Sequence, residues 1–352
     1  MHSPCSQHRR IVLLTDGHST PFLAKTAISL LRYRTADIVA VLDRQAAGQT
    51  ADQLLRAGGE IPVVDSLQSV PEFDAIYVGI APPGGKMPPQ WRSVLMEAID
   101  RRAAVVSGLH DFITDDPELV GRAERAGSAL IDIRKNSLKT IASGQAFRPE
   151  CLRIQSVGQD CTIGKMVCTL ELQRGLAAAG YDAAFLATGQ TGIMISGRGV
   201  PVDCVVSDFV NGAVEQLVAA HQQHDFLLIE GQGSIAHPAY SAVTLGLMHG
   251  AAPQGLVYCY EAGRTMVKGF SDYPIVDHAV QIQAYRVAAS LRHPCDIIGV
   301  AVNTRNLAPA AARAEVDWAE QQFGLPACDV YRDGADKLVQ ACVQLRQHWV
   351  TT

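Results

Sequence analysis

Short apolar runs alternate with segments of helical periodicity along most of the chain. In the first half, runs of four or five residues occur at 11–14, 38–42, 61–64, 75–79, 103–107 and 129–133. Between them, as in the segment that opens near Thr20 and Pro21, apolar residues recur three and four positions apart, which predicts helices with one buried face. Strands that alternate with helices in this way are typical of a parallel sheet covered by helices.

The second half repeats this alternation. Apolar runs at 152–157, 183–187, 226–230, 256–260, 297–302 and 329–331 predict further strands, and the segment after Lys165 has a helical apolar stripe that ends near Gly180. Right-handed crossovers place the carboxyl ends of parallel strands at one edge of a sheet, where ligands bind. The predicted fold class is therefore α/β, with two doubly wound domains and mainly parallel sheets, the first domain being Rossmann-like.

The length of the chain supports two domains. It has 352 residues, whereas a single hydrophobic core usually stops growing at about 250–300 residues. Residues 132–147 are polar and poorly periodic, which indicates a linker or flap, so we place the domains at 1–148 and 149–352. A hydrophobic content of 48%, a charged content of 18% and a formal net charge of -5 favour neither nucleic acid nor membrane as a partner.

The cysteines and the N-terminal segment bear on the compartment. The nine cysteines include no Cys-x-x-Cys pair, which favours buried thiols in a reducing compartment over a metal or disulfide framework. The first apolar segment, residues 11–14, is too short for a signal peptide or a membrane span. We therefore expect a cytoplasmic protein without a metal site, and as partners a small-molecule substrate and further copies of the chain.

A glycine-rich loop joins the first strand of the second half to its helix. The loop residues, which we expect to bind the cofactor, are Gly158, Gln159, Asp160, Cys161, Thr162, Ile163, Gly164, Lys165 and Met166. Backbone N–H groups of such a loop turn toward an anion, the helix adds its dipole, and Lys165 should face the anion and solvent rather than the core. Five residues instead of four separate the glycines, and Met166 replaces the usual Ser or Thr ligand of Mg²⁺. The loop thus resembles the dethiobiotin-synthetase branch of the P-loop proteins, and the second domain is expected to be P-loop NTPase-like.

Further polar residues follow the other strands at the same edge. Glu230 ends an apolar strand where a second acidic motif of P-loop proteins holds Mg²⁺, and His237 is either a general base or a loop histidine. Arg264 can clamp a carboxylate or phosphate, or form a surface ion pair, and Asn303 can bind the edge of a cofactor adenine. The residues expected to bind substrate, although their turns could be purely structural, are Thr188, Gly189, Gln190, Thr191, Gly192, Arg198, Gln232, Ser234, Arg264 and, in the first half, His110.

With these residues in hand, the chain resembles the DUF1611 family over nearly its full length. Besides the glycine-rich loop, the strings that carry this resemblance are Gly79-Ile-Ala-Pro with Gly84-Gly85, Ser107-Gly-Leu-His110, Ala187-Thr-Gly-Gln-Thr-Gly192, Gly197-Arg-Gly-Val-Pro-Val-Asp203, Ile229-Glu-Gly-Gln-Gly-Ser234 with His237-Pro238, and Gly299-Val-Ala-Val-Asn-Thr304. The resemblance implies a Rossmann-like N-terminal half and a P-loop-like C-terminal half. One branch of the family is similar to D-glutamate N-acetyltransferases, which move the acetyl group of acetyl-CoA onto an amino acid amine.

The leading hypothesis is an acyl-CoA-dependent N-acyltransferase that acetylates an amino acid, with D-glutamate as one candidate acceptor. Coenzyme A can place its phosphates in the loop without Mg²⁺, which suits Met166, so acetyl-CoA is the expected cofactor. We expect Glu230 to be the base, with His237 as the second candidate, and backbone N–H groups of residues 231–234 or 189–192 to hold the oxyanion. Arg264 or Arg198 would bind the acceptor carboxylate.

Two alternatives remain open at this stage. An ATP-dependent ligase or kinase resembling dethiobiotin synthetase would need Mg²⁺, for which Asp160 and Glu230 could compensate the missing hydroxyl. A nucleotide-binding protein without catalytic activity is the other.

Overall fold

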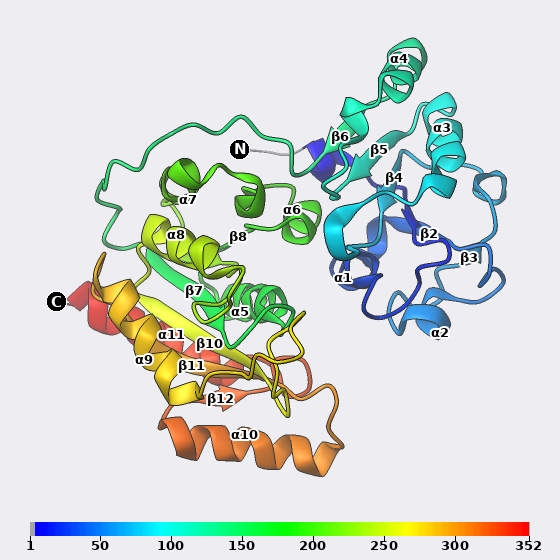
Figure 1. Cartoon of the computed structure of the whole chain (residues 1–352). Helices are drawn as coiled ribbons and strands as arrows, with labels where there is room; N and C mark the ends of the chain where they lie inside the picture. Colours follow the sequence, from blue (N-terminus) through cyan, green and yellow to red (C-terminus); the bar gives the residue numbers. More distant parts are fainter. Residues whose placement is uncertain (1–3, 352) are drawn as a thin grey trace. The chain divides into compact units, whose positions relative to one another are not determined.

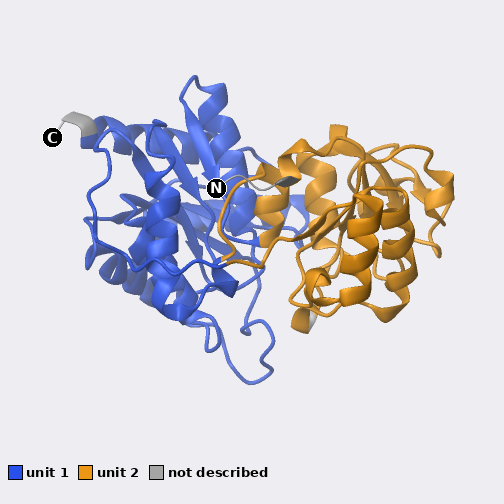
Figure 2. Ribbon diagram, turned by 90° about the horizontal axis from the view of Figure 1, so that it is seen from above, with its two compact units in different colours: residues 1, 137–189, 202–352 blue, residues 2–136, 190–201 orange. Residues whose placement is uncertain are grey.

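The computed structural model describes residues 4–351, which form two compact units (Figures 1 and 2). The N-terminal unit extends to Asn136 and also contains Gln190–Pro201, whereas the C-terminal unit consists of Ser137–Gly189 and the chain from Val202 onward. The expected boundary between residues 148 and 149 concerns which parts of the chain fold independently. The two compact units do not test this, so the boundary remains a prediction.

The N-terminal unit contains one parallel sheet of six strands in the order β3-β2-β1-β4-β5-β6. The strands are β1 (Ile11–Leu14), β2 (Ile38–Leu42), β3 (Val63–Val64), β4 (Ala75–Val78), β5 (Ala104–Ser107) and β6 (Leu130–Asp132). The strand order reverses direction between β1 and β4, as in doubly wound sheets. The predicted Rossmann-like fold of this half is therefore confirmed.

Helices cover this sheet. They are α1 (Lys25–Tyr33), α2 (Ala51–Leu55), α3 (Arg92–Asp100) and α4 (Pro117–Ala126). The inserted segment adds α6 (Gln190–Ser196), which packs against α1. Short 3₁₀ helices lie at Pro4–Gln7, Thr35–Asp37, Leu67–Ser69, Pro83–Gly85, Pro89–Trp91 and Ile113–Asp115. The expected helix start near Thr20 is wrong by one turn, because residues 21–24 form turns in which Thr20 accepts hydrogen bonds from the N–H groups of Leu23 and Ala24.

The C-terminal unit contains a second parallel sheet of six strands, in the order β12-β11-β10-β7-β9-β8. The strands are β7 (Leu152–Gly158), β8 (Ala183–Leu186), β9 (Phe226–Ile229), β10 (Gly255–Glu261), β11 (Asp296–Asn303) and β12 (Ala327–Cys328). β7 pairs with β9 on one side and with β10 on the other. The carboxyl end of β7 therefore lies between the ends of two other buried strands.

Helices pack on both faces of the second sheet. One core cluster joins β7 to α5 (Lys165–Ala178) and α11 (Asp336–Thr351). A second joins the opposite face to α8 (Ser241–Ala251), α9 (His278–Ser290) and α10 (Pro309–Phe323). The remaining helices are α7 (Val210–Ala219) and 3₁₀ turns at Val202–Cys204 and Ser207–Phe209. This three-layer arrangement confirms the predicted α/β class for the second half as well.

The last strand lies two residues earlier than the apolar pattern predicts. Ala327 and Cys328 pair with β11, whereas the expected strand at 329–331 is a turn. The Asp329 carboxylate causes this ending, because it accepts hydrogen bonds from the N–H groups of Thr304, Tyr331 and Arg332. Within residues 4–351 no cysteine forms a disulfide, and no helix there combines the length and apolarity needed to cross a membrane.

The irregular segment before β7 is tied to α7 by one buried carboxylate. Glu215, which is 3% exposed, accepts hydrogen bonds from Ser143 N (2.7 Å), Ser143 Oγ (2.8 Å) and Gly144 N (2.8 Å). Gly212 on the same helix lets the chain approach closely, since a Cβ atom there would lie 2.0 Å from Thr140 O. The expected linker is thus anchored to the C-terminal unit.

We predict that Glu215→Ala lowers the free energy of unfolding by about 2 kcal/mol, because it removes charge-assisted hydrogen bonds to a buried acceptor. Limited proteolysis should also cut residues 137–148 faster in this variant. The control is Glu150→Ala, whose exposed carboxylate lies near Arg148 and should contribute less than about 1 kcal/mol. Equal losses of stability in the two variants would show that Glu215 does not anchor the segment.

Candidate functional site

The loop between β7 and α5 has the backbone geometry of an anion cradle. Gly158 allows close packing, since a Cβ atom there would lie 2.4 Å from Ile163 Cδ1 and 2.5 Å from Cys259 O. Thr162 and Gly164 both have positive φ angles, 59° and 110°. Such an angle is unusual for a β-branched residue, so at Thr162 it indicates that the loop is held in an unfavourable backbone conformation. The first N–H groups of α5 have no partner within the helix and point out of its N-terminus. These features favour phosphate binding.

Lys165, the cation of this loop, is buried. It is 7% exposed, and its Nζ donates to Asp160 O (2.7 Å) and to Gly233 O (2.8 Å). Our expectation that Lys165 faces solvent is therefore wrong for this structure, because two carbonyl oxygens hold the ammonium group inside the loop. Burial lowers the pKa of Lys165 below its ordinary value. An anion in the loop would offer this desolvated group an opposite charge.

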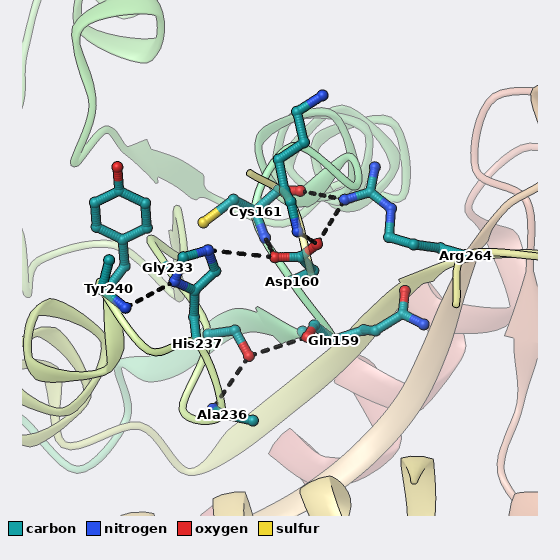
Figure 3. A network of polar contacts seen from close by, with 12 residues as sticks. Gln159, Asp160, Cys161, Gly233, Ala236, His237, Tyr240 and Arg264 are labelled. Atoms are coloured by element: carbon teal, nitrogen blue, oxygen red, sulfur yellow. Dashed lines mark hydrogen bonds and ion pairs between the residues drawn. The ribbon is translucent and has the colours of Figure 1, made fainter. Parts of the chain in front are cut away.

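A fully buried carboxylate, Asp160, supports the loop through its hydrogen bonds. Its Oδ2 accepts hydrogen bonds from Arg264 Nη1 (2.8 Å) and from the N–H of Lys268 (2.8 Å), while its Oδ1 accepts one from Cys161 N (2.6 Å). Arg264 also donates to Cys161 O (2.9 Å) (Figure 3). A further hydrogen bond joins its Nη2 to Glu261 Oε2 (2.5 Å). In this state the guanidinium group supports the loop, and its expected contact with a substrate carboxylate remains a prediction.

The ends of β10 and β11 complete the support of the loop. Glu261 accepts hydrogen bonds from Arg305 (2.8 Å) and Asn306 (3.0 Å) besides that from Arg264. Asn303 donates its side-chain amide to Ile163 O (2.9 Å), so this amide, expected to bind an adenine edge, contacts the loop here. Gln159 accepts the N–H of Glu261 through its side-chain oxygen (3.1 Å), and Met166 follows Lys165 partly exposed.

Glu230 lies directly after β9, at the same sheet edge as the loop. Its Oε2 accepts the backbone N–H groups of Thr188 (3.0 Å) and Gly189 (3.2 Å), and the Gln232 side chain also hydrogen-bonds to the carboxyl group. These donors are neutral, so burial prevails and raises the pKa of Glu230 to about 7, with Asp203 adding to the shift. A carboxyl group that titrates near neutrality can exchange a proton with a substrate.

The turns around Glu230 are already engaged in the protein. Gly189 N donates to Glu230 itself and Gly231 N donates to Ser156 Oγ (3.0 Å). Gln232 donates to Thr188 Oγ1 (3.2 Å), and Ser234, which is fully buried, donates to Gln159 O (3.1 Å). The N–H groups of Gly189 and Gly231 are therefore occupied in this state, and an oxyanion needs other donors.

His237 lies beside the loop with its ring buried. Nδ1 accepts the N–H of Ala239 (3.1 Å), and Nε2 faces Asp160 Oδ1 at 3.7 Å (Figure 3). The rings of Tyr240 and Phe270 flank the imidazole, with centroids at 4.6 and 5.7 Å. The ligand atoms of Asp160, Cys161 and His237 lie within 4.8 Å of one another, close enough to surround a metal ion.

The remaining expected substrate residues lie in the N-terminal unit. Gln190 accepts a hydrogen bond from Arg134 (2.7 Å), and the Thr191 hydroxyl bonds to that of Thr26 (2.9 Å). Gly192 and Arg198 belong to the same inserted segment, and His110 follows β5. The structure thus brings Thr188, Gly189 and Gln232 together with Glu230. The binding roles of all the expected substrate residues remain predictions.

Two supports of the loop were missed from the sequence. The Tyr285 hydroxyl donates to Gly158 O (2.8 Å) and accepts the N–H of Ile235 (2.9 Å), so it joins the start of the loop to the segment after Glu230. Lys268 donates its backbone N–H to Asp160. Neither contact is visible in the local sequence. The pattern around Tyr285 predicts a core position of a helix, and any residue other than proline can supply a backbone N–H.

The topology and the loop together define a P-loop protein with a Rossmann-like N-terminal half. The matching family profiles are "Domain of unknown function (DUF1611_C) P-loop domain" over residues 140–339 and "Domain of unknown function (DUF1611_N) Rossmann-like domain" over residues 44–136. The chain belongs to the DUF1611 family, as its motifs indicate.

Solved and curated relatives agree with this assignment. A crystal structure of a DUF1611 family protein from Anabaena variabilis is similar to this chain with a TM-score of 0.89 and 37% identity, over 96% of this chain and 99% of that one. A D-glutamate N-acetyltransferase from Tritonibacter scottomollicae is 40% identical over 76% of this chain and 80% of its own. A second D-glutamate N-acetyltransferase, from a Pseudoalteromonas species, is 37% identical over 74% of this chain and 79% of its own.

The raised pKa of Glu230 predicts a pH-dependent gain in stability for Glu230→Gln. Folding raises this pKa from 4.5 to about 7, so the native state retains the proton more strongly and Glu230 loses its favourable contribution as pH rises through this window. The difference in unfolding free energy between variant and parent should grow by on the order of 3 kcal/mol from pH 4.5 to pH 7.5. Denaturant unfolding at several pH values measures this difference, and Glu150→Gln, at an exposed carboxylate, is the control. A difference that does not change with pH would contradict the prediction.

Proposed function

We propose that the chain is an N-acetyltransferase that moves an acetyl group from acetyl-CoA to the amine of an amino acid of the D-glutamate class. The names of the curated relatives support this class of reaction. The observation that carries the proposal is Glu230, a buried carboxyl group with a pKa of about 7 at the sheet edge that also bears the phosphate loop. The loop would hold the phosphates of CoA, and Glu230 would take a proton from the acceptor.

The proton balance of the reaction explains why such a group is needed. An acetyl thioester supplies a carbonyl carbon with a thiol leaving group. The amine attacks only in its neutral form, and the new C–N bond leaves a proton on nitrogen that must be removed as the C–S bond breaks. Ionised Glu230 accepts this proton, and the departing thiolate takes one back to give the free thiol. A base poised near pH 7 is suited to both directions of this exchange.

The donor set of the loop favours CoA over ATP with Mg²⁺. Met166 offers no hydroxyl ligand, and both oxygens of Asp160 already accept hydrogen bonds from Arg264, Lys268 and Cys161. A metal ion that bridges ATP phosphates needs hard oxygen ligands beside the loop. CoA can place its phosphates in the loop without a metal ion and makes no such demand, so the ATP-dependent alternatives rank second.

The first prediction concerns binding. Lys165→Ala should weaken CoA binding by about a hundredfold, because an ammonium–phosphate contact in a desolvated loop is lost. Titration calorimetry measures the affinity, and circular dichroism checks that the fold is intact. Lys139→Ala, which removes an exposed lysine, is the charge-matched control. Affinity for CoA should persist in excess EDTA, and a strict requirement for Mg²⁺ or tight binding of Mg·ATP alone would favour the ligase.

The second prediction concerns turnover. Glu230→Gln should retain CoA affinity and lose at least ~10²-fold in kcat for acetylation of an amino acid, the usual size of a general-base contribution. In the parent, kcat should rise with pH through about 7, because only ionised Glu230 accepts a proton, and the variant should lack this rise. A panel of D- and L-amino acids with acetyl-CoA provides the assay. If the parent acetylates none of them, the acetyltransferase proposal is wrong.

A further inference from the structure

One nitrogen of His237 is buried without a hydrogen-bond partner. The side chain is 1% exposed, and among the described residues Nε2 has no partner, since Asp160 Oδ1 lies 3.7 Å away, beyond hydrogen-bond length. Buried polar atoms in native proteins are nearly always paired with protein or water, and an exception points to a ligand or another functional role. The question is therefore which partner this nitrogen is placed to receive.

The protonation of the ring follows from its other nitrogen. Ala239 N–H is directed at Nδ1 at 3.1 Å, so Nδ1 carries a lone pair. A neutral imidazole has one protonated and one unprotonated nitrogen, which places the proton on Nε2. The atom that faces the loop is thus an N–H donor, and the partner it lacks is an acceptor.

This tautomer disfavours two other roles. A general base needs a lone pair toward the substrate, but Nε2 presents a proton. A metal ligand also needs the Nε2 lone pair, and a ligating histidine then donates its remaining N–H to an acceptor. Here the remaining nitrogen faces the N–H donor of Ala239, so the cluster of Asp160, Cys161 and His237 has the wrong outer hydrogen bond for a metal site.

Neighbouring groups hold the ring in this orientation. Tyr240 and Phe270 lie against the imidazole, with centroid distances of 4.6 and 5.7 Å. The nearby negative charge of Asp160 is offset by Arg264, whose Nη1 lies 2.8 Å from Oδ2. A ligand oxygen beside Nε2 would therefore approach a compensated carboxylate instead of an isolated charge.

We propose that His237 binds the ligand as a neutral donor, giving its Nε2–H to a phosphate oxygen of the molecule held by the loop of residues 158–166. The placement favours phosphate over other oxygens because Nε2 faces two residues of the loop itself, Asp160 and Cys161. His237 would add a side-chain donor to those of Lys165 and the α5 N-terminus. This inference rests on phosphate binding in the loop, which the proposed function shares, and not on the identity of the acceptor or on acetyl transfer.

Three substitutions of His237 separate its two nitrogens. Glutamine can place an N–H near the position of Nε2, asparagine can preserve the acceptor for Ala239 but does not reach the loop, and phenylalanine retains a ring against Tyr240. We expect His237→Asn and His237→Phe to weaken CoA binding ten- to a hundredfold, the size of a lost hydrogen bond to a charged group. His237→Gln should stay within about threefold of the parent. Calorimetry with CoA, ADP and inorganic pyrophosphate gives the affinities, each in excess EDTA.

A direct readout of the proton completes the test. In a ¹H–¹⁵N spectrum of ¹⁵N-histidine-labelled protein, the signal that disappears in His237→Gln should show the Nε2–H tautomer and shift when CoA is added. Equal affinity in all three variants, a signal of the Nδ1–H form, or Zn²⁺ binding that depends on His237 would overturn the proposal. A loss of kcat at unchanged affinity would also overturn it, by moving His237 to the reacting carbonyl. The affinities and the tautomer are measured by binding alone, so these two readouts stand even if no amino acid is acetylated.

Discussion

The buried charge of Asp160 is the constraint on which the loop depends. A carboxylate with no solvent exposure is stable only when cations and N–H donors compensate it. Arg264 supplies the cation, Glu261 then orients the guanidinium group, and Arg305 compensates Glu261 in turn. This chain of charges runs from the loop to the ends of β10 and β11. Several polar residues at the sheet edge are therefore there to hold the loop in shape, which leaves fewer of them to contact a substrate.

Two carboxylates at one sheet edge are given different chemistry by their neighbours. Asp160 meets a guanidinium group, whereas Glu230 meets only the neutral donors of Thr188, Gly189 and Gln232. At Glu230 desolvation outweighs these hydrogen bonds and raises the pKa of the carboxyl group to about 7, and that shift makes it able to exchange protons at neutral pH. The placement follows from topology, because β9 is the direct neighbour of β7 and both end at the edge that bears the loop.

Local pattern predicted what depends on local sequence, and contacts distant in sequence account for the rest. The strands, the loop and the position of Glu230 followed from apolar runs and from glycine and lysine spacing. The end of β12 did not, because Asp329 acts through Thr304, and neither did the burial of Lys165, which needs Gly233 O. Arg264 looked like a substrate clamp because its partner Asp160 lies 104 residues earlier in the chain. An unpaired nitrogen of His237 has no signature in a sequence at all.

Lys165 connects the state of the loop to the segment that carries both Glu230 and His237. Its ammonium group bonds to Asp160 O on the loop and to Gly233 O, which lies between these two residues in sequence. The ammonium has three donors, so a phosphate that draws Nζ either adds to these bonds or replaces one of them. Replacing the bond to Gly233 would free a turn whose glycine has a φ of 63° and leaves no room for a Cβ atom beside Tyr240 O, at 2.4 Å. The same desolvation that lowers the pKa of Lys165 makes either exchange sensitive to the charge that enters the loop.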